Sequence, residues 1–160
     1  MVSGLSLARI TVHSPHVATL AGWAHEAWGH LHPGRGRAAA IASLRAECGA
    51  SGVPSVFAAM EDERPVGMAS LVVDDMNDRA SLTPWLASVY VLPEWRGRGV
   101  ATALVRRVED EARDHGHGLF YLYTPDQQSL YRRLGWQAVE EREYHGETVT
   151  IMRRTLTPAD

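Results

Sequence analysis

Apolar residues with alternating or helical spacing divide the chain into strands and helices that follow one another in mixed order. Short alternating or continuous apolar runs predict strands, at residues 7–12, 55–61, 66–73, 85–92, 119–123, 136–144 and 147–156. Apolar positions three or four residues apart predict helices, at residues 14–29, 37–48, 98–115 and 124–134. This order predicts a mixed α/β domain.

The run at residues 85–92 and the helix after it are the most distinctive part of this pattern. The run is apolar on both faces and only Ser88 interrupts it, which indicates a central strand. The helix has one apolar stripe, formed by Val100, Ala101, Leu104, Val105, Val108 and Ala112. On its other side, Glu109 and Arg113 are expected to form an exposed i,i+4 pair. Together with the next strand, these elements should make a right-handed parallel crossover.

A glycine-rich loop, Arg96-Gly97-Arg98-Gly99-Val100-Ala101, joins that strand to that helix. A helix N-terminus carries unpaired amides and partial positive charge, which together bind phosphate groups. Gly97 and Gly99 let the backbone approach an anion closely, and Arg96 and Arg98 add positive charge. The loop lacks the Gly-Lys-Ser/Thr ending of a P-loop and the third glycine of a dinucleotide fingerprint. It therefore predicts a phosphate site of another kind.

Two segments resemble motifs of the Gcn5-related N-acetyltransferase (GNAT) superfamily. The segment VYVLPEWRGRGVA at 89–101 is similar to motif A, Arg/Gln-x-x-Gly-x-Gly/Ala, whose specified places are filled by Arg96, Gly99 and Ala101. The segment SLYRRLGW at 129–136 is similar to the family's Phe/Leu-Tyr-x-x-Leu-Gly-aromatic segment. The resemblance implies a GNAT-like mixed, mostly antiparallel sheet of about six to seven strands with four helices, in which the central parallel strands splay apart.

The resemblance further implies acetyl transfer from acetyl-CoA to an amine, without a metal or a covalent enzyme intermediate. The backbone amides of residues 98–102 would bind the pyrophosphate, and the backbone of residues 89–91 would pair with the pantetheine arm. A backbone N–H near Val91 would polarise the thioester carbonyl. The expected acetyl-CoA-binding residues are Val89, Tyr90, Val91, Arg96, Gly97, Arg98, Gly99, Val100, Ala101 and Thr102.

Tyr131, in the second segment, is the expected catalytic acid. CoA leaves as a thiolate, and because a thiol has a pKa near ~8.5 and a tyrosine one near ~10, a tyrosine can protonate the sulfur. The alternative is that Tyr131 only packs in the core. Many relatives carry a Glu base on the strand that here holds Ala87 and Ser88, and this chain has no acid there. The base is left open among Glu26, Asp74, His25, His30 and a water chain.

These motifs do not identify the acceptor amine. The candidate walls of its pocket are Trp23, Trp28, Trp85 and Tyr123. The stretch 123–128 is similar to the corresponding region of the actin N-terminal acetyltransferase branch, which favours acidic peptide N-termini. Such an acceptor needs a basic groove, to which Arg35, Arg132 and Arg133 are candidates to contribute. A small-molecule amine, including a polyamine or an aminoglycoside, is the alternative acceptor. An acyl-CoA-binding sensor or structural module without catalysis is the alternative class of protein.

Composition excludes several other classes. The 160 residues fit one domain, expected at 5–156 with a short tail at 157–160. A net charge of −3 disfavours a nucleic-acid partner, and no apolar run has the length of a membrane span. Cys48 is the single cysteine, so neither an intramolecular disulfide nor a metal cluster is expected. We expect no signal peptide and a cytoplasmic location. Because several GNAT proteins are dimers, a homodimer stays open.

Overall fold

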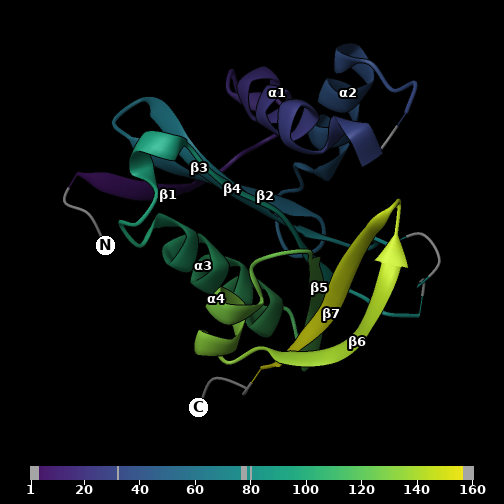
Figure 1. Ribbon diagram of the computed structural model, residues 1–160. Coiled ribbons are helices and arrows are strands. Elements are labelled where there is room, and N and C mark those ends of the chain that lie inside the picture. The colour runs from purple at the N-terminus through teal and green to yellow at the C-terminus, as the bar shows by residue number, and fades with distance from the viewer. Residues whose placement is uncertain (1–3, 32, 77–78, 80, 157–160) are drawn as a thin grey trace.

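One sheet of seven strands carries the fold, in the spatial order β1-β2-β3-β4-β5-β7-β6 (Figure 1). The computed structural model describes residues 4–31, 33–76, 79 and 81–156. The strands are β1 (Leu5–Arg9), β2 (Ser55–Glu61), β3 (Arg64–Val72), β4 (Trp85–Val91), β5 (Leu119–Thr124), β6 (Gln137–Tyr144) and β7 (Glu147–Thr155). The helices are α1 (Val17–Trp28), α2 (Arg37–Glu47), α3 (Val100–Asp114) and α4 (Gln128–Arg133), with 3₁₀ turns η1 (Gly29–Leu31) and η2 (Pro93–Trp95). The predicted α/β class and element order are confirmed, and the tail 157–160 lies outside the described residues.

The helices α1 and α4 begin later than the sequence predicted, because a turn held by a side chain precedes each of them, and α3 begins at Val100 rather than at about residue 98. Before α1, the Ser14 hydroxyl accepts a hydrogen bond from the His16 amide at 3.1 Å, and the helix begins after His16. Before α4, the Thr124 hydroxyl accepts a hydrogen bond from the Gln127 amide at 3.0 Å, and the helix begins after Gln127. Ser14 and Thr124 therefore stabilise turns rather than the first turn of a helix.

β4 and β5 run parallel and separate almost at once. They are paired only between Trp85 and Tyr121, whereas the other neighbouring strands are antiparallel. On its other side β4 bulges against β3, since Ser88 has a φ of 55° and the register shifts between Met68 and Ser70. The predicted splay of the central parallel strands is confirmed, and it leaves one edge of β4 without a neighbouring strand beyond Trp85.

Helices cover both faces of the sheet (Figure 1). On one face, α1 and α2 pack against β1, β2 and β3 around a shared apolar cluster. On the other face lies α3, whose stripe is buried at Val100, Leu104, Val105, Val108 and Ala112, as predicted. The hairpin of β6 and β7 extends the sheet beyond β5. Within the described part of the chain, no helix combines the length and the apolar character that crossing a membrane requires.

The polar side of α3 differs from its prediction. Glu109 is only 2% exposed, and Arg113 pairs with Asp110 at 2.9 Å instead. The Glu109 carboxylate accepts a hydrogen bond from Nε1 of Trp136 at 3.2 Å and forms an ion pair with Arg106 at 2.7 Å. A buried indole N–H requires an acceptor. The long-range contact with Trp136 therefore outweighs the helical spacing that predicted an exposed pair.

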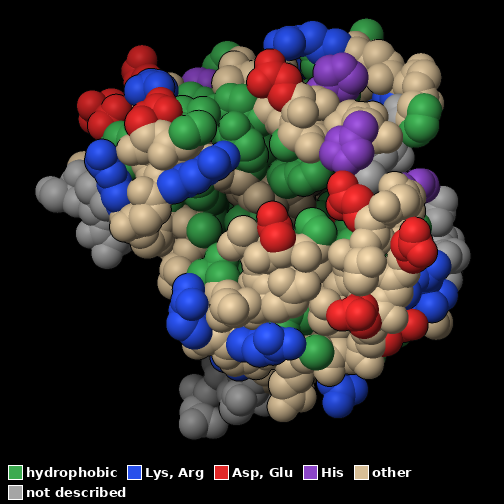
Figure 2. Space-filling view, in the orientation of Figure 1, with side chains coloured by type: hydrophobic (Ala, Val, Ile, Leu, Met, Phe, Trp, Pro, Cys, Tyr) green, Lys and Arg blue, Asp and Glu red, His purple; other side chains and the backbone are tan. Residues whose placement is uncertain are grey.

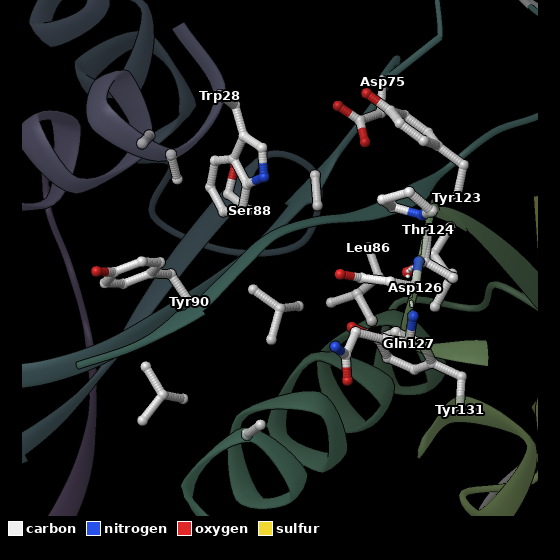
Figure 3. A pocket seen from close by; sticks show the side chains of 18 of the residues that line it. Trp28, Asp75, Leu86, Ser88, Tyr90, Tyr123, Thr124, Asp126, Gln127 and Tyr131 are labelled. Atoms are coloured by element: carbon white, nitrogen blue, oxygen red, sulfur yellow. Dashed lines mark hydrogen bonds between the residues drawn. The ribbon is translucent and has the colours of Figure 1, made fainter. Parts of the chain in front are cut away.

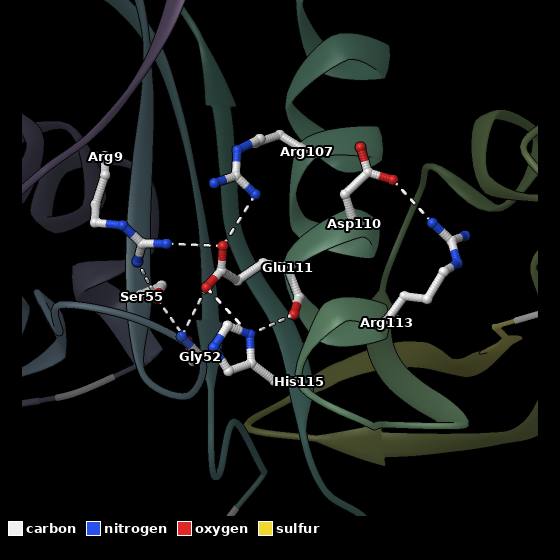
Figure 4. A network of polar contacts seen from close by, with 8 residues as sticks. All are labelled: Arg9, Gly52, Ser55, Arg107, Asp110, Glu111, Arg113 and His115. Atoms are coloured by element: carbon white, nitrogen blue, oxygen red, sulfur yellow. Dashed lines mark hydrogen bonds and ion pairs between the residues drawn. The ribbon is translucent and has the colours of Figure 1, made fainter. Parts of the chain in front are cut away.

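A second carboxylate, Glu111, connects the C-terminal half of α3 to the sheet (Figure 4). Its Oε1 lies 2.7 Å from Arg9 and 3.0 Å from Arg107, and its Oε2 accepts a hydrogen bond from the Gly52 amide at 2.7 Å. Nδ1 of His115 lies 3.4 Å away. Burial alone would raise the pKa of Glu111, but these donors outweigh it and lower the pKa to about 2. The ionised carboxylate thus joins α3 to β1 and to the loop before β2.

Candidate active site

A cleft of about 1160 Å³ opens where β4 and β5 separate. Its walls come from α1, η1 and α2, from β4 and the N-terminus of α3, and from β5, α4 and the start of β7. Figure 2 shows a hollow in this face that apolar side chains border, with acidic and histidine side chains beside it. The wall segments are far apart in the sequence, so the complete cleft exists only in the folded chain.

The N-terminus of α3 forms one end of the cleft. Gly97 and Gly99 have φ values of 76° and 82°, in the left-handed region that favours glycine. The first helical hydrogen bond runs from the Ala103 amide to the Gly99 carbonyl at 3.0 Å. The amides of residues 100–102 therefore have no partner within the helix, and the helix dipole adds partial positive charge beside them. This geometry suits a phosphate group.

The two arginines of the loop have different surroundings. Nε of Arg96 donates a hydrogen bond to the Val91 carbonyl at 2.9 Å, which ties the loop to the end of β4. Arg98 lies over the Trp95 ring, 4.9 Å from its centre, and does not line the cleft. The other predicted acetyl-CoA residues all line it, namely Val89, Tyr90, Val91, Arg96, Gly97, Gly99, Val100, Ala101 and Thr102.

The free edge of β4 runs along the cleft from the splay toward α3. Residues 86–91 all line the cleft. Because β5 pairs with β4 only at Trp85, the backbone groups on that side of residues 86–91 have no strand partner. The bulge at Ser88 changes the direction of these groups. An extended ligand can pair with such an edge as an added strand would.

Tyr131 lies on α4, at another wall of the cleft (Figure 3). Its side chain is buried, with 6% exposed, and packs edge-to-face on Trp136 with ring centres 6.0 Å apart. Burial, together with the nearby charge of Asp126, raises the pKa of Tyr131 to about 12. The phenol therefore keeps its proton at neutral pH, so it is a proton donor rather than a base.

The aromatic residues predicted as pocket walls divide into two groups. Trp28 and Tyr123 line the cleft. Trp23 packs in the apolar cluster between α1 and the sheet, and Trp85 is fully buried; neither lines the cleft. Tyr144, which the sequence did not single out, does line it, with its ring centre 5.5 Å from that of Tyr123. Helical or strand spacing does not distinguish core from cleft for such residues.

The structure places only some of the candidate bases at the cleft. His25, His30 and Asp74 line the cleft, whereas Glu26 is exposed and does not line it. Nε2 of His30 lies 3.1 Å from the Glu147 carboxylate, which joins η1 to the start of β7. Glu26 is therefore not in a position to receive a proton inside the cleft.

Two carboxylates that the sequence did not single out, Glu47 and Asp75, also line the cleft. Glu47 is the last residue of α2, and Asp75 follows β3 and lies near Tyr123 (Figure 3). Burial, only partly offset by Arg35, raises the pKa of Glu47 to about 7. Burial and the charge of Glu47 raise the pKa of Asp75. The polar stretch after β3 was visible in the sequence, but no local signal indicated that it lies over the cleft.

A comparison with protein families defines the class of this fold and site. The model described as the Acetyltransferase (GNAT) family matches residues 18–136. This range includes the glycine-rich loop, the whole free edge of β4, and Tyr131. The chain therefore belongs to the Acetyltransferase (GNAT) family, and the resemblance drawn from two short segments is confirmed.

Individual relatives agree with this assignment. The chain is 38% identical over 104 residues to a mycothiol acetyltransferase of Nocardiopsis dassonvillei, over 61% of this chain and 28% of the relative. The chain thus spans less than a third of that relative's length. Its fold is similar to that of yncA from Salmonella typhimurium, solved with its cofactor acetyl-CoA (TM-score 0.71, 19% identity, 97% and 95% of the two chains). It is also similar to an aminoglycoside 6'-N-acetyltransferase complexed with coenzyme A (TM-score 0.76, 14% identity, 97% and 99% of the two chains).

Proposed function

We propose that this protein transfers an acetyl group from acetyl-CoA to a primary amine by direct attack of the amine on the thioester. The observation that carries the proposal is the meeting of three features in one cleft: an anion-binding helix N-terminus, a free strand edge, and a buried tyrosine. Membership of the Acetyltransferase (GNAT) family supports it. So does the similarity of fold to acetyltransferases solved with acetyl-CoA or coenzyme A.

The donor is expected to lie along β4. Its pyrophosphate would accept hydrogen bonds from the amides of residues 98–102, and the extended pantetheine arm would pair with the backbone of residues 89–91. Arg96 contributes by fixing the loop against β4 through the Val91 carbonyl. A backbone N–H near Val91 would then polarise the thioester carbonyl, and one such donor typically contributes about 3 kcal/mol to catalysis.

Tyr131 is the proposed acid in the second half of the reaction. The amine nitrogen attacks the carbonyl carbon and forms a tetrahedral intermediate with a negative oxygen. When this intermediate collapses, the C–S bond breaks and the sulfur takes the phenolic proton of Tyr131. The proton that the amine loses passes to a carboxylate or to water in the cleft, and Tyr131 regains its proton from solvent. The products are the acetylated amine and free CoA.

The alternative of an acyl-CoA-binding module without turnover rested on the absence of an acid from β4. The cleft nevertheless contains carboxylates, because Glu47 lines it from the end of α2 and Asp75 lines it from the segment after β3. Tyr131, buried at the wall of the same cleft, also favours the enzyme.

The test is thiol release from acetyl-CoA over a panel of amines and peptides, measured beside acetyl-CoA binding. Tyr131→Phe should lower kcat by at least about tenfold and leave acetyl-CoA affinity nearly unchanged, because only the proton donor is removed. Tyr121→Phe is a matched control, since Tyr121 lies on β5 but does not line the cleft. A near-normal kcat for Tyr131→Phe would contradict the acid role. Tight acetyl-CoA binding without turnover of any acceptor would favour the binding module.

A further inference from the structure

The acceptor side of the cleft is strongly asymmetric in charge. The acidic residues that line the cleft are Glu47, Asp74, Asp75, Asp126 and Glu147, and the arginines that line it are Arg35 and Arg96. Arg96 belongs to the donor side, where it holds the end of β4. Arg35 is thus the one guanidinium at the acceptor side within the described residues, and its charge only partly offsets the effect of burial on the pKa of Glu47. This side attracts cations.

Arg132 and Arg133 do not change this balance. Both side chains are exposed on α4 and neither lines the cleft. The basic groove that an acidic peptide N-terminus would need is therefore not built by these two residues. The charge of the cleft favours the other class of acceptor left open by the sequence, a small amine.

Glu47 and Asp75 lie in surroundings that disfavour the ionised form of a carboxylate unless a cation binds beside it. Glu47 is the last residue of α2, and the C-terminal end of a helix dipole disfavours an anion. Asp75 has no hydrogen bond or ion pair with another described residue. The two carboxylates repel each other, and burial raises the pKa of each. A bound organic cation would relieve all of these costs at once.

Aromatic rings beside these acids suit the same kind of ligand. Tyr123 lies near Asp75 (Figure 3), and its ring stands edge-to-face to Tyr144, with centres 5.5 Å apart. Trp28 lines the same cleft from the end of α1. Ring faces attract ammonium groups, and the attraction grows when the site is desolvated.

From these observations we infer that the acceptor carries at least two ammonium groups, one of which binds at Glu47 and Asp75 while another nitrogen is acetylated. This inference rests on the proposed acetyl transfer and assigns the substrate class of that site. The two carboxylates set specificity, since they hold a part of the substrate that does not react. An alkyl diamine or a polyamine is the chemistry that fits.

The first test compares 1,3-diaminopropane with propylamine, which has the same carbon chain and one nitrogen fewer. The wild-type protein should have a kcat/KM for the diamine at least about tenfold above that for the monoamine, because only the diamine pairs with the carboxylates. This measurement needs no variant, so it does not depend on the folding of any mutant. Equal kcat/KM values for the two amines, at normal turnover, would overturn the inference and leave acetyl transfer standing. Absence of turnover on every amine would overturn the proposed function itself.

The second test uses Glu47→Gln and Asp75→Asn, each of which keeps the size of the side chain and removes its charge. Each should lower the diamine-to-monoamine ratio by about tenfold, mainly through KM for the diamine. Acetyl-CoA affinity should change little, because both residues lie on the acceptor side of the cleft. Glu26→Gln is the matched control, because Glu26 is exposed on α1 and does not line the cleft, so it should keep the ratio. An unchanged ratio in both test variants would overturn the role of this pair.

The pH dependence gives a readout that a purely structural role would not produce. Because burial holds the pKa of Glu47 near 7, KM for the diamine should rise as the pH falls below neutrality, more steeply than KM for propylamine. In Glu47→Gln this difference in slope should disappear, and its persistence would contradict the assignment. The other titratable or charged groups that line this side are His25, His30, Arg35, Asp74, Asp75, Tyr123, Tyr144, His145 and Glu147, and all of them are present in both proteins.

Discussion

Replacing Glu111 by Gln should cost the protein stability that depends on pH. The donors around Glu111 lower its pKa from an ordinary 4.5 to about 2. One pKa unit corresponds to about 1.36 kcal/mol, so the ionised carboxylate contributes about 3 kcal/mol at neutral pH. Because the pKa is lower in the folded state, this stabilisation is complete above the ordinary pKa and is lost as the pH falls toward 2. At about pH 3 only about 1 kcal/mol remains.

The assay is urea denaturation of the wild-type protein and Glu111→Gln at pH 7 and at about pH 3. The two free energies of unfolding should differ by about 3 kcal/mol at pH 7 and should converge toward acid. Asp110→Asn is the matched control on the same helix, since Asp110 makes an exposed pair with Arg113 and should cost less than about 1 kcal/mol. An equal loss at both pH values would refute the reasoning, because it would mean that shape rather than charge is what Glu111 contributes.

Two further predictions concern the N-terminus and the buried face of α3. Gly99→Ala should lower the stability of the fold by about 1 kcal/mol and weaken acetyl-CoA binding, because φ at Gly99 is 82° and a side chain strains that backbone although the space around it is open. Thermal melts measure the stability and calorimetry measures the affinity for acetyl-CoA. Unchanged affinity would contradict the phosphate role of the loop. Glu109→Ala should lower the free energy of unfolding by about 3 kcal/mol, because it leaves the Trp136 indole and Arg106 without their buried partner. Denaturation followed by tryptophan fluorescence checks this, and a loss below about 1 kcal/mol would show that the buried pair contributes little.

Local patterns predicted most of the fold. The strand β2 has the predicted limits, 55–61, and the stripe of α3 is buried where its spacing indicated. The bulge at Ser88 was not predictable, since serine has no marked preference for a positive φ. Glu109 was misjudged because its partner, Trp136, lies beyond the next strand and helix. Helical spacing carries no information about a contact with so distant a residue.

The donor side and the acceptor side of the cleft also differ in how much of each could be predicted from the sequence. The donor side is built from one continuous segment, residues 89–102, so its motif and its glycines were visible together in the sequence. The acceptor side combines the end of α2, the segment after β3, the end of β5 and the start of β7. Glu47 and Asp75 meet only through tertiary packing. Among the acids of the chain, the sequence offered no reason to prefer them to Glu26 or Asp74.

Side-chain contacts connect the helix α3, whose N-terminus lies at the proposed acetyl-CoA site, to Tyr131, the proposed acid. The N-terminus of α3 lines the phosphate end of the cleft, and nine residues into the helix Glu109 accepts the hydrogen bond of Trp136. Trp136 in turn packs against Tyr131, and its amide donates a hydrogen bond to the Tyr131 carbonyl at 2.9 Å. The buried carboxylate therefore fixes the orientation of α4 relative to the loop that would hold acetyl-CoA. A tyrosine on a helix as short as α4 has few local interactions to position it, so its packing on Trp136 and within the apolar core holds it at the wall of the cleft.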